Sequence, residues 1–110
     1  MAMVKKFKTN GSTDEELKAE CKAETNCDDC DISWTTPSIG IRIDPPDKTV
    51  AIVIDAVSEK GRIRIYQKDN DEQLDGVGIE WAGHKVMVPW DNTWWFRASG
   101  SLPVGYISRK

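Results

Sequence analysis

The sequence predicts a mainly β fold of the α+β class, a small antiparallel barrel or sandwich of about six to seven strands with one N-terminal helix. Three observations support this. A single capped helical segment lies near the start, alternating apolar and polar residues fill most of the remainder, and turn signals recur roughly every eight to twelve residues. A length of 110 residues corresponds to one domain. We expect this domain at residues 12–110, preceded by a flexible basic N-terminal arm at residues 1–11.

The predicted helix begins near Ser12 and ends near Thr25-Asn26. Ser12 and Thr13 each have a glutamate three positions later, which is the spacing of a capping box. Its apolar side is narrow, because Leu17 and Cys21 are the main residues on it. We therefore expect the helix to pack through one stripe and to be solvated elsewhere.

The first half of the remaining chain predicts one loop followed by three strands. Residues 27–37 are expected to form a loop anchored by Trp34, and residues 38–44 a half-buried strand with Ile39, Ile41 and Ile43 on one face. The nearly continuous apolar run at 50–57 predicts a central strand covered on both faces. A turn at 59–61 leads to a strand at 62–66, so these three strands are expected to form an antiparallel meander.

The second half predicts an acidic loop and four more strands. The loop spans residues 69–76, and the strands are expected at 77–82, 85–90, 94–99 and 104–108. The oxygen-rich loop superficially matches a calcium-binding loop, but a solvated hairpin is favoured because the required glycine is missing. Pro89 lacks an amide donor and predicts an edge or a bulge in its strand.

Residues 77–106 contain most of the tryptophans of the chain. Trp94 alternates with Phe96 and Ala98, whereas Trp95 alternates with Arg97 and Ser99. Because neighbouring residues of a strand point to opposite faces, Trp94 is predicted in the core and Trp95 on the outer or partner-facing side. A bulge before Trp94 would exchange the two roles.

The segment Trp94-Trp95-Phe96-Arg97-Ala98-Ser99, followed by Gly105-Tyr106-Ile107-Ser108, resembles the closing strands of Src-homology-type small barrels. The resemblance covers roughly fifteen residues and implies a small barrel. The opening aromatic motif of that family is absent, and Ser108-Arg109-Lys110 stands where the family has Pro-Ser-Asn-Tyr. We therefore transfer no proline-peptide function.

The net charge is −3 and the isoelectric point is about 5.1, which argues against a general nucleic-acid binder. The first residues lack the apolar stretch of a signal peptide, and no segment has the length of a membrane span. Three cysteines fit a disulfide framework poorly. We therefore expect a soluble cytoplasmic protein with reduced thiols.

Cysteine spacing provides a weak metal-site candidate. Cys27 and Cys30 have the spacing of metal ligands, and Cys21 and His84 would complete a Cys₃His zinc site. A single Cys-x-x-Cys is a weak signal, and the acidic neighbours disfavour a reactive thiolate. Free structural thiols or an adventitious disulfide are the favoured interpretation, with no metal and no cofactor.

Asp55 lies in the most apolar strand, where a carboxylate needs a partner. Arg42 or Arg64 would supply it in a structural ion pair. A carboxylate pair of Asp55 and Glu80 would resemble a glycosidase site, but no pattern in the sequence brings the two together.

The function favoured by the sequence is a non-enzymatic binding or interaction module. Its predicted binding residues are Trp95, Arg97, Trp90, Trp81 and Tyr106, on a Trp-rich face that contacts a protein partner or a second copy. No catalytic residue is predicted. Two alternatives remain open: a carbohydrate-binding module with a tryptophan platform, and a small enzyme with its site in the barrel mouth.

Overall fold

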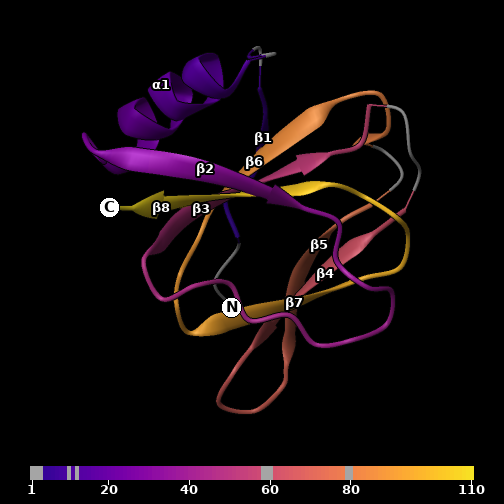
Figure 1. Ribbon diagram of the computed structural model, residues 1–110. Coiled ribbons are helices and arrows are strands. Elements are labelled where there is room, and N and C mark those ends of the chain that lie inside the picture. Colours follow the sequence, from indigo (N-terminus) through magenta and orange to yellow (C-terminus); the bar gives the residue numbers. More distant parts are fainter. Residues whose placement is uncertain (1–3, 10, 12, 58–60, 79–80) are drawn as a thin grey trace.

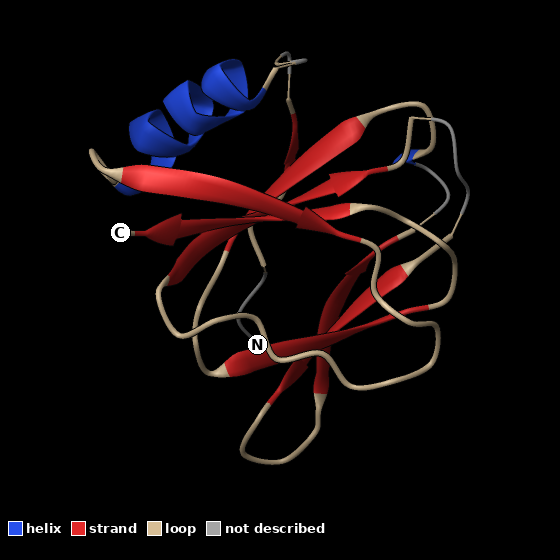
Figure 2. Cartoon of the chain, in the orientation of Figure 1, coloured by secondary structure: helices blue, strands red, loops and turns tan. Residues whose placement is uncertain are grey.

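The computed structural model describes residues 4–9, 11, 13–57, 61–78 and 81–110 (Figure 1). They form a five-stranded and a three-stranded antiparallel sheet with one helix, α1 (Asp14–Thr25) (Figure 2). The five-stranded sheet has the order β1 (Phe7–Lys8), β6 (Lys85–Pro89), β3 (Thr49–Asp55), β8 (Val104–Arg109), β2 (Cys30–Thr35). The three-stranded sheet has the order β5 (Gln73–Val77), β4 (Ile63–Gln67), β7 (Trp94–Ala98).

The predicted mainly antiparallel β fold with one N-terminal helix is confirmed. Within the described residues the two sheets share no strand and pack as a sandwich instead of closing into a barrel. The segments that resemble the closing strands of Src-homology-type barrels, β7 and β8, belong to different sheets.

Strand β3 is the centre of the fold, as the apolar run predicts. It pairs with β6 on one side and β8 on the other. Ala51 and Val53 face α1, whereas Ile52 and Ile54 face the three-stranded sheet, and all four side chains are fully buried. Alternation along one strand therefore supplies side chains to both cores.

Helix α1 begins and ends close to the predicted positions. Thr13 is the N-cap, and it exchanges capping-box hydrogen bonds with Glu16, so the second of the two candidate caps is used. Asn26 ends the helix in the left-handed conformation. Leu17 and Cys21 are fully buried against the five-stranded sheet, which confirms the predicted stripe.

The described part of the N-terminal segment packs onto the domain. Phe7 and Lys8 pair with β6, and Val4 is buried in the core between the sheets. Lys5 also forms an ion pair with Glu24 at the end of α1. The apolar side chains at positions 4 and 7 provide the contacts that dock this segment.

Two predictions for residues 27–44 are wrong. Cys30–Thr35 is strand β2, paired with β8, in place of a loop. The strand is missed because it is an edge with little apolar surface: of its residues, Cys30 and Ile32 pack against the core near the helix. Residues 38–44 lie along β7 but form only one bridge, between Ile43 and Phe96. Gly40 interrupts the alternation with a φ of 80°, which leaves Ile39 exposed.

The predicted meander is also wrong, because β3 and β4 lie in different sheets. Both edges of β3 are occupied by β6 and β8, so β4 pairs with β5 and β7. Residues 59–60 of the turn predicted at 59–61 lie outside the described residues. The acidic loop is shorter than predicted because β5 begins at Gln73.

The strand predicted at 77–82 is not formed as expected. Val77 ends β5, residues 79–80 lie outside the described residues, and the Trp81 amide donates to the carbonyl of Gly78 in a turn. Pro89 is the last residue of β6, and the short strand β1 pairs only with Val86 and Met87. The side of β6 next to β1 is therefore an edge at Pro89, as its missing amide donor predicts.

We expect Leu17→Ala to lower the free energy of unfolding by about 2–4 kcal/mol, because the fully buried side chain leaves a cavity between α1 and the sheet. Urea unfolding monitored by tryptophan fluorescence measures the change. The matched control is Ala19→Ser on the exposed side of the same helix. Equal, small effects of both substitutions would show that α1 is not docked through its Leu17 stripe.

Candidate functional site

The outward side of the three-stranded sheet gathers arginines and aromatic rings. In β4, Ile63 and Ile65 are buried in the core between the sheets. Arg64 and Tyr66 alternate with them along the strand and therefore point outward. In β7 Phe96 and Ala98 are buried in the same way. We call the resulting surface the arginine face; it consists of Arg62, Arg64, Tyr66, Trp95 and Arg97, together with Arg42 from the segment beside β7.

Tyr66 and Trp95 form the aromatic centre of this face. They are opposite each other in the β4–β7 register, and their rings stack with centroids 4.3 Å apart and planes inclined by 12°. The Trp95 Nε1 donates to Oδ1 of Asp71 at 3.1 Å. Asp71 reaches this position from a turn in which its own φ is 55°. The turn therefore covers the outer side of β7, and Trp95 is only 7% exposed.

Two guanidinium groups flank the stacked rings. The Cζ of Arg42 lies 5.0 Å from the Trp95 ring centroid, and that of Arg97 lies 5.5 Å from the Tyr66 centroid. Arg97 also donates from Nη2 to the Tyr66 Oη at 2.9 Å. The hydrogen bond from Arg42 to Asp44 raises the pKa of the arginine, although desolvation opposes this. The rings thus orient both arginines.

Within the described residues, carboxylates pair with Arg42 but with none of the other three arginines of this face. Arg64 and Arg97 are directly opposite across β4 and β7, an arrangement in which like charges repel. Arg42 is paired with Asp44 and Asp71, but in the part of the chain that the structure describes, Arg62, Arg64 and Arg97 form no ion pair. An anion bound between the facing arginines would relieve this repulsion.

Two shallow hollows meet at Arg64. One of about 250 Å³ lies toward β5 and is lined by Arg62, Gln73 and Gly76 among others. The other, of about 230 Å³, lies toward β7 and is lined by Arg97, Ser99 and Ile39 among others. Gly76 is opposite Arg64, and a Cβ there would approach the Ile63 carbonyl oxygen to 3.0 Å. Because Gly76 has no side chain, β5 can lie close to β4 at this point, and space remains beside Arg64.

An apolar border adjoins the charged surface. Ile39 is 59% exposed and Ile41 is 52% exposed. Both belong to the segment that runs along β7, where the Gly40 amide donates to the Ala98 carbonyl and Ile43 pairs with Phe96. Exposed isoleucines next to arginines provide both apolar and ionic contacts for a ligand.

The five predicted binding residues do not form a single face. Trp95 and Arg97 lie on the arginine face, whereas Trp90, Trp81 and Tyr106 pack against the core between the sheets. Trp90 makes edge-on ring contacts with Trp94 and Phe96. Burial raises the pKa of the Tyr106 hydroxyl. Their participation in binding stays a prediction.

The predicted sides of Trp94 and Trp95 are confirmed, but their predicted burial is not. Trp94 packs against the core between the sheets and is half-buried at the start of β7. Trp95 lies on the opposite side, as alternation requires, yet it is the more buried of the two. The reason is that Tyr66, Arg42 and Asp71 cover it.

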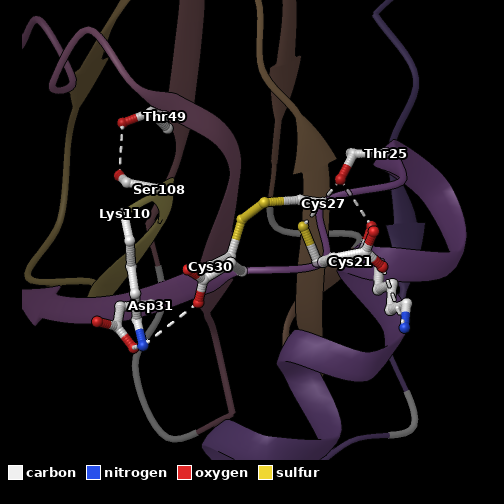
Figure 3. The surroundings of a disulfide bond; sticks show 11 residues. Cys21, Thr25, Cys27, Cys30, Asp31, Thr49, Ser108 and Lys110 are labelled. Carbon is white, nitrogen blue, oxygen red and sulfur yellow. Dashed lines mark hydrogen bonds and ion pairs between the residues drawn. A yellow bond between two sulfur atoms is a disulfide. The ribbon is translucent and has the colours of Figure 1, made fainter.

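The weak metal candidates do not converge. Cys27 and Cys30 form a disulfide, and Cys21 is a buried free thiol in contact with the Thr25 hydroxyl (Figure 3). Burial raises the pKa of the Cys21 thiol, and the hydrogen bond with Thr25 partly opposes this. His84 is exposed beside a different hollow. Within the described residues no group of three or more histidine, cysteine or acidic side chains has metal-binding geometry.

Asp55 has neither of its predicted arginine partners among the described ion pairs. Its Oδ1 instead accepts the backbone amide of Val57 at 3.1 Å, at the partly exposed end of β3. Arg42 pairs with other carboxylates and Arg64 lies on the arginine face. Glu80 lies outside the described residues.

Sequence reasoning missed Arg62, Arg64, Tyr66 and Arg42 as members of one surface. The signal was present at residues 62–66, the start of β4 and the residue before it, where Arg-Ile-Arg-Ile-Tyr places two arginines and a tyrosine on the same side. Pairing of β4 with β7, which brings Arg97 opposite Arg64, required the topology.

Comparison with known protein families, with curated proteins and with solved structures gave no match to this chain. No helix in the described part of the chain has the length and apolar character needed to cross a membrane.

We expect the stacked rings to be energetically coupled. A double-mutant cycle with Tyr66→Leu, Trp95→Leu and the double variant should give a coupling of about 0.5–1.5 kcal/mol, as for other aromatic pairs. Denaturant unfolding of the four proteins measures it. The control cycle pairs Trp95→Leu with Tyr106→Leu, whose ring packs against the core between the sheets. Additive effects in the first cycle would contradict the stacked arrangement.

Proposed function

We propose that this protein is a non-enzymatic binding domain that uses its arginine face to contact an acidic segment of a protein partner. The observation on which the proposal rests is the cross-strand pair of Arg64 and Arg97. Together with Arg62, these residues form no ion pair within the described structure. Carboxylates of a partner would provide the missing counter-charges through bidentate hydrogen bonds.

The local surface favours a protein segment over a sugar or a nucleic acid. A sugar platform or a base-stacking platform needs a free aromatic ring face. The Trp95 ring is stacked on Tyr66 and covered by Arg42, so little of it is accessible. Exposed Ile39 and Ile41 beside the arginines suit a peptide that combines acidic and apolar side chains.

Association of two copies through the same face is disfavoured by charge. In a twofold interface the same surface of both molecules meets, so each arginine would lie near the arginines of the second molecule. Such an arrangement increases the repulsion that already exists between Arg64 and Arg97. A partner with the opposite charge removes the repulsion, so we favour a different protein over a second copy.

An enzymatic function has less support in the described structure. Catalysis needs a nucleophile or base held by an orienting partner. His84, the one histidine of the chain, is exposed in a turn, and its ring makes no hydrogen bond within the described residues. The Cys21 thiol is buried and its pKa is raised, which disfavours the reactive thiolate.

A glutamate-rich peptide that also contains isoleucine or leucine should bind the native protein with an affinity that falls as salt increases. Arg64→Ala and Arg97→Ala should each weaken binding about tenfold, because each removes one charge-assisted contact. Fluorescence anisotropy of a labelled peptide at two salt concentrations measures this. The matched control is Arg109→Ala, at the end of β8 in the other sheet.

The outcomes separate the alternatives. Equal binding by the wild type, the Arg64 and Arg97 variants and the Arg109 control would overturn the proposal. Preferential binding of a single-stranded oligonucleotide, or of soluble glycans, through the same residues would assign a different ligand class. Light scattering on the free protein tests association, and a dimer broken by Arg64→Ala would identify a second copy as the partner.

A further inference from the structure

The Cys27–Cys30 disulfide lies at the corner between α1 and β2, on the side of the molecule away from the arginine face. Cys27 is buried, whereas Cys30, at the start of β2, is partly exposed. Both line a hollow of about 230 Å³ beside α1, together with Lys18, Lys22 and Asp28. Figure 3 shows the disulfide at this corner, close to Cys21 of the helix. Cys30 is therefore the more exposed of the two bonded cysteines, beside a hollow that a small molecule can enter.

The backbone on both sides of the disulfide is held independently of the bond. The Asn26 amide donates to the Lys22 carbonyl at 2.8 Å, which fixes the end of the helix. Cys30 pairs with Arg109 in the β2–β8 ladder, and the Lys110 amide donates to the Asp29 carbonyl at 3.1 Å. After reduction the two thiols would therefore remain neighbours, and the disulfide would form again readily.

The fold does not depend on this bond for its main contacts. The disulfide joins residues only three apart, and such short loops restrict the unfolded chain least. Helix α1 is attached through Leu17 and Cys21 to Ala51, Val53 and other buried residues of the five-stranded sheet. Opening the disulfide leaves these contacts intact, which is what a reversible exchange site requires.

We propose that Cys27 and Cys30 are a reversible thiol–disulfide exchange site that reacts with low-molecular-weight thiols in the native protein. An incoming thiolate attacks the sulfur of Cys30, a mixed disulfide forms there, and Cys27 leaves as a thiolate that takes a proton from water. A second thiolate then attacks the reagent sulfur of the mixed disulfide. One oxidised reagent disulfide and the Cys27 and Cys30 thiols result, so two electrons pass from the reagent to the protein.

The surrounding charges and the third cysteine are compatible with this assignment. Lys22 pairs with Asp28, and Lys110 pairs with Asp29, so these acidic residues have counter-charges. Lys110 also pairs with Asp31 (Figure 3). Cys21 is buried and its sulfur contacts the Thr25 hydroxyl. Burial keeps this thiol protonated, so it does not compete for the disulfide.

Reduction of the folded protein by dithiothreitol tests the proposal. The extent of reaction is measured by alkylating free thiols and counting them by mass spectrometry, while tryptophan fluorescence and circular dichroism follow the fold. We expect the rate to increase in proportion to the dithiothreitol concentration, the spectra to stay native, and oxidised dithiothreitol or oxidised glutathione to restore the disulfide. Cys21→Ser should react within about twofold of the wild-type rate.

A matched pair of variants identifies the attacked sulfur. With oxidised glutathione, Cys27→Ser should accumulate a mixed disulfide at the partly exposed Cys30, because the resolving thiol is absent. Cys30→Ser should react much more slowly at the buried Cys27. Reduction that proceeds only at the rate of unfolding, loss of the native spectra on reduction, or a purified protein that keeps three free thiols with oxidised glutathione would each overturn the proposal.

Discussion

Burial of β3 on both faces is the constraint on which the rest of the structure depends. The side chains of Ala51 and Val53 are buried by α1 on one face of the strand. Those of Ile52 and Ile54 are buried by the three-stranded sheet on the other face. Among the described residues, no helix and no further sheet packs on the outer side of that second sheet; only Asp71, in a turn, and Arg42 cover Trp95 there. Outside this small aromatic cluster the side chains do not have to fit a core, so arginines are accommodated there.

The features that depend on a few neighbouring residues were predicted correctly from the sequence. The capping box at Thr13, the Leu17 stripe and the two-sided burial at residues 50–57 each follow from a few neighbouring residues. Strand pairing did not follow, because it depends on which edges remain available. The edges of β3 are taken by β6 and β8, which come later in the chain, and this moves β4 into the other sheet. The largely exposed edge strand β2 lacked the apolar stripe that identifies a strand.

Trp95 shows where prediction of a site from sequence stops. Alternation correctly placed it opposite the core, but an outward side chain is exposed only if the chain provides nothing to cover it. Here Asp71, in a turn distant in sequence, and Arg42, in an irregular segment, both reach the ring. The candidate site therefore shifted from tryptophan to the arginines that the rings orient, a result that required knowledge of the β4–β7 register.

The two proposed sites lie in different layers, and this separates them energetically. The disulfide lies between the end of α1 and the start of β2, in the layer of the five-stranded sheet, whereas the arginine face belongs to the three-stranded sheet. Figure 1 shows the strands of these two layers. The core between the sheets contains side chains from both, but neither cysteine is in it. Residues that share no partner contribute additively to stability and binding. We therefore expect reduction at the corner to leave the arginine face unchanged, and a peptide bound at that face to leave the reactivity of Cys30 unchanged.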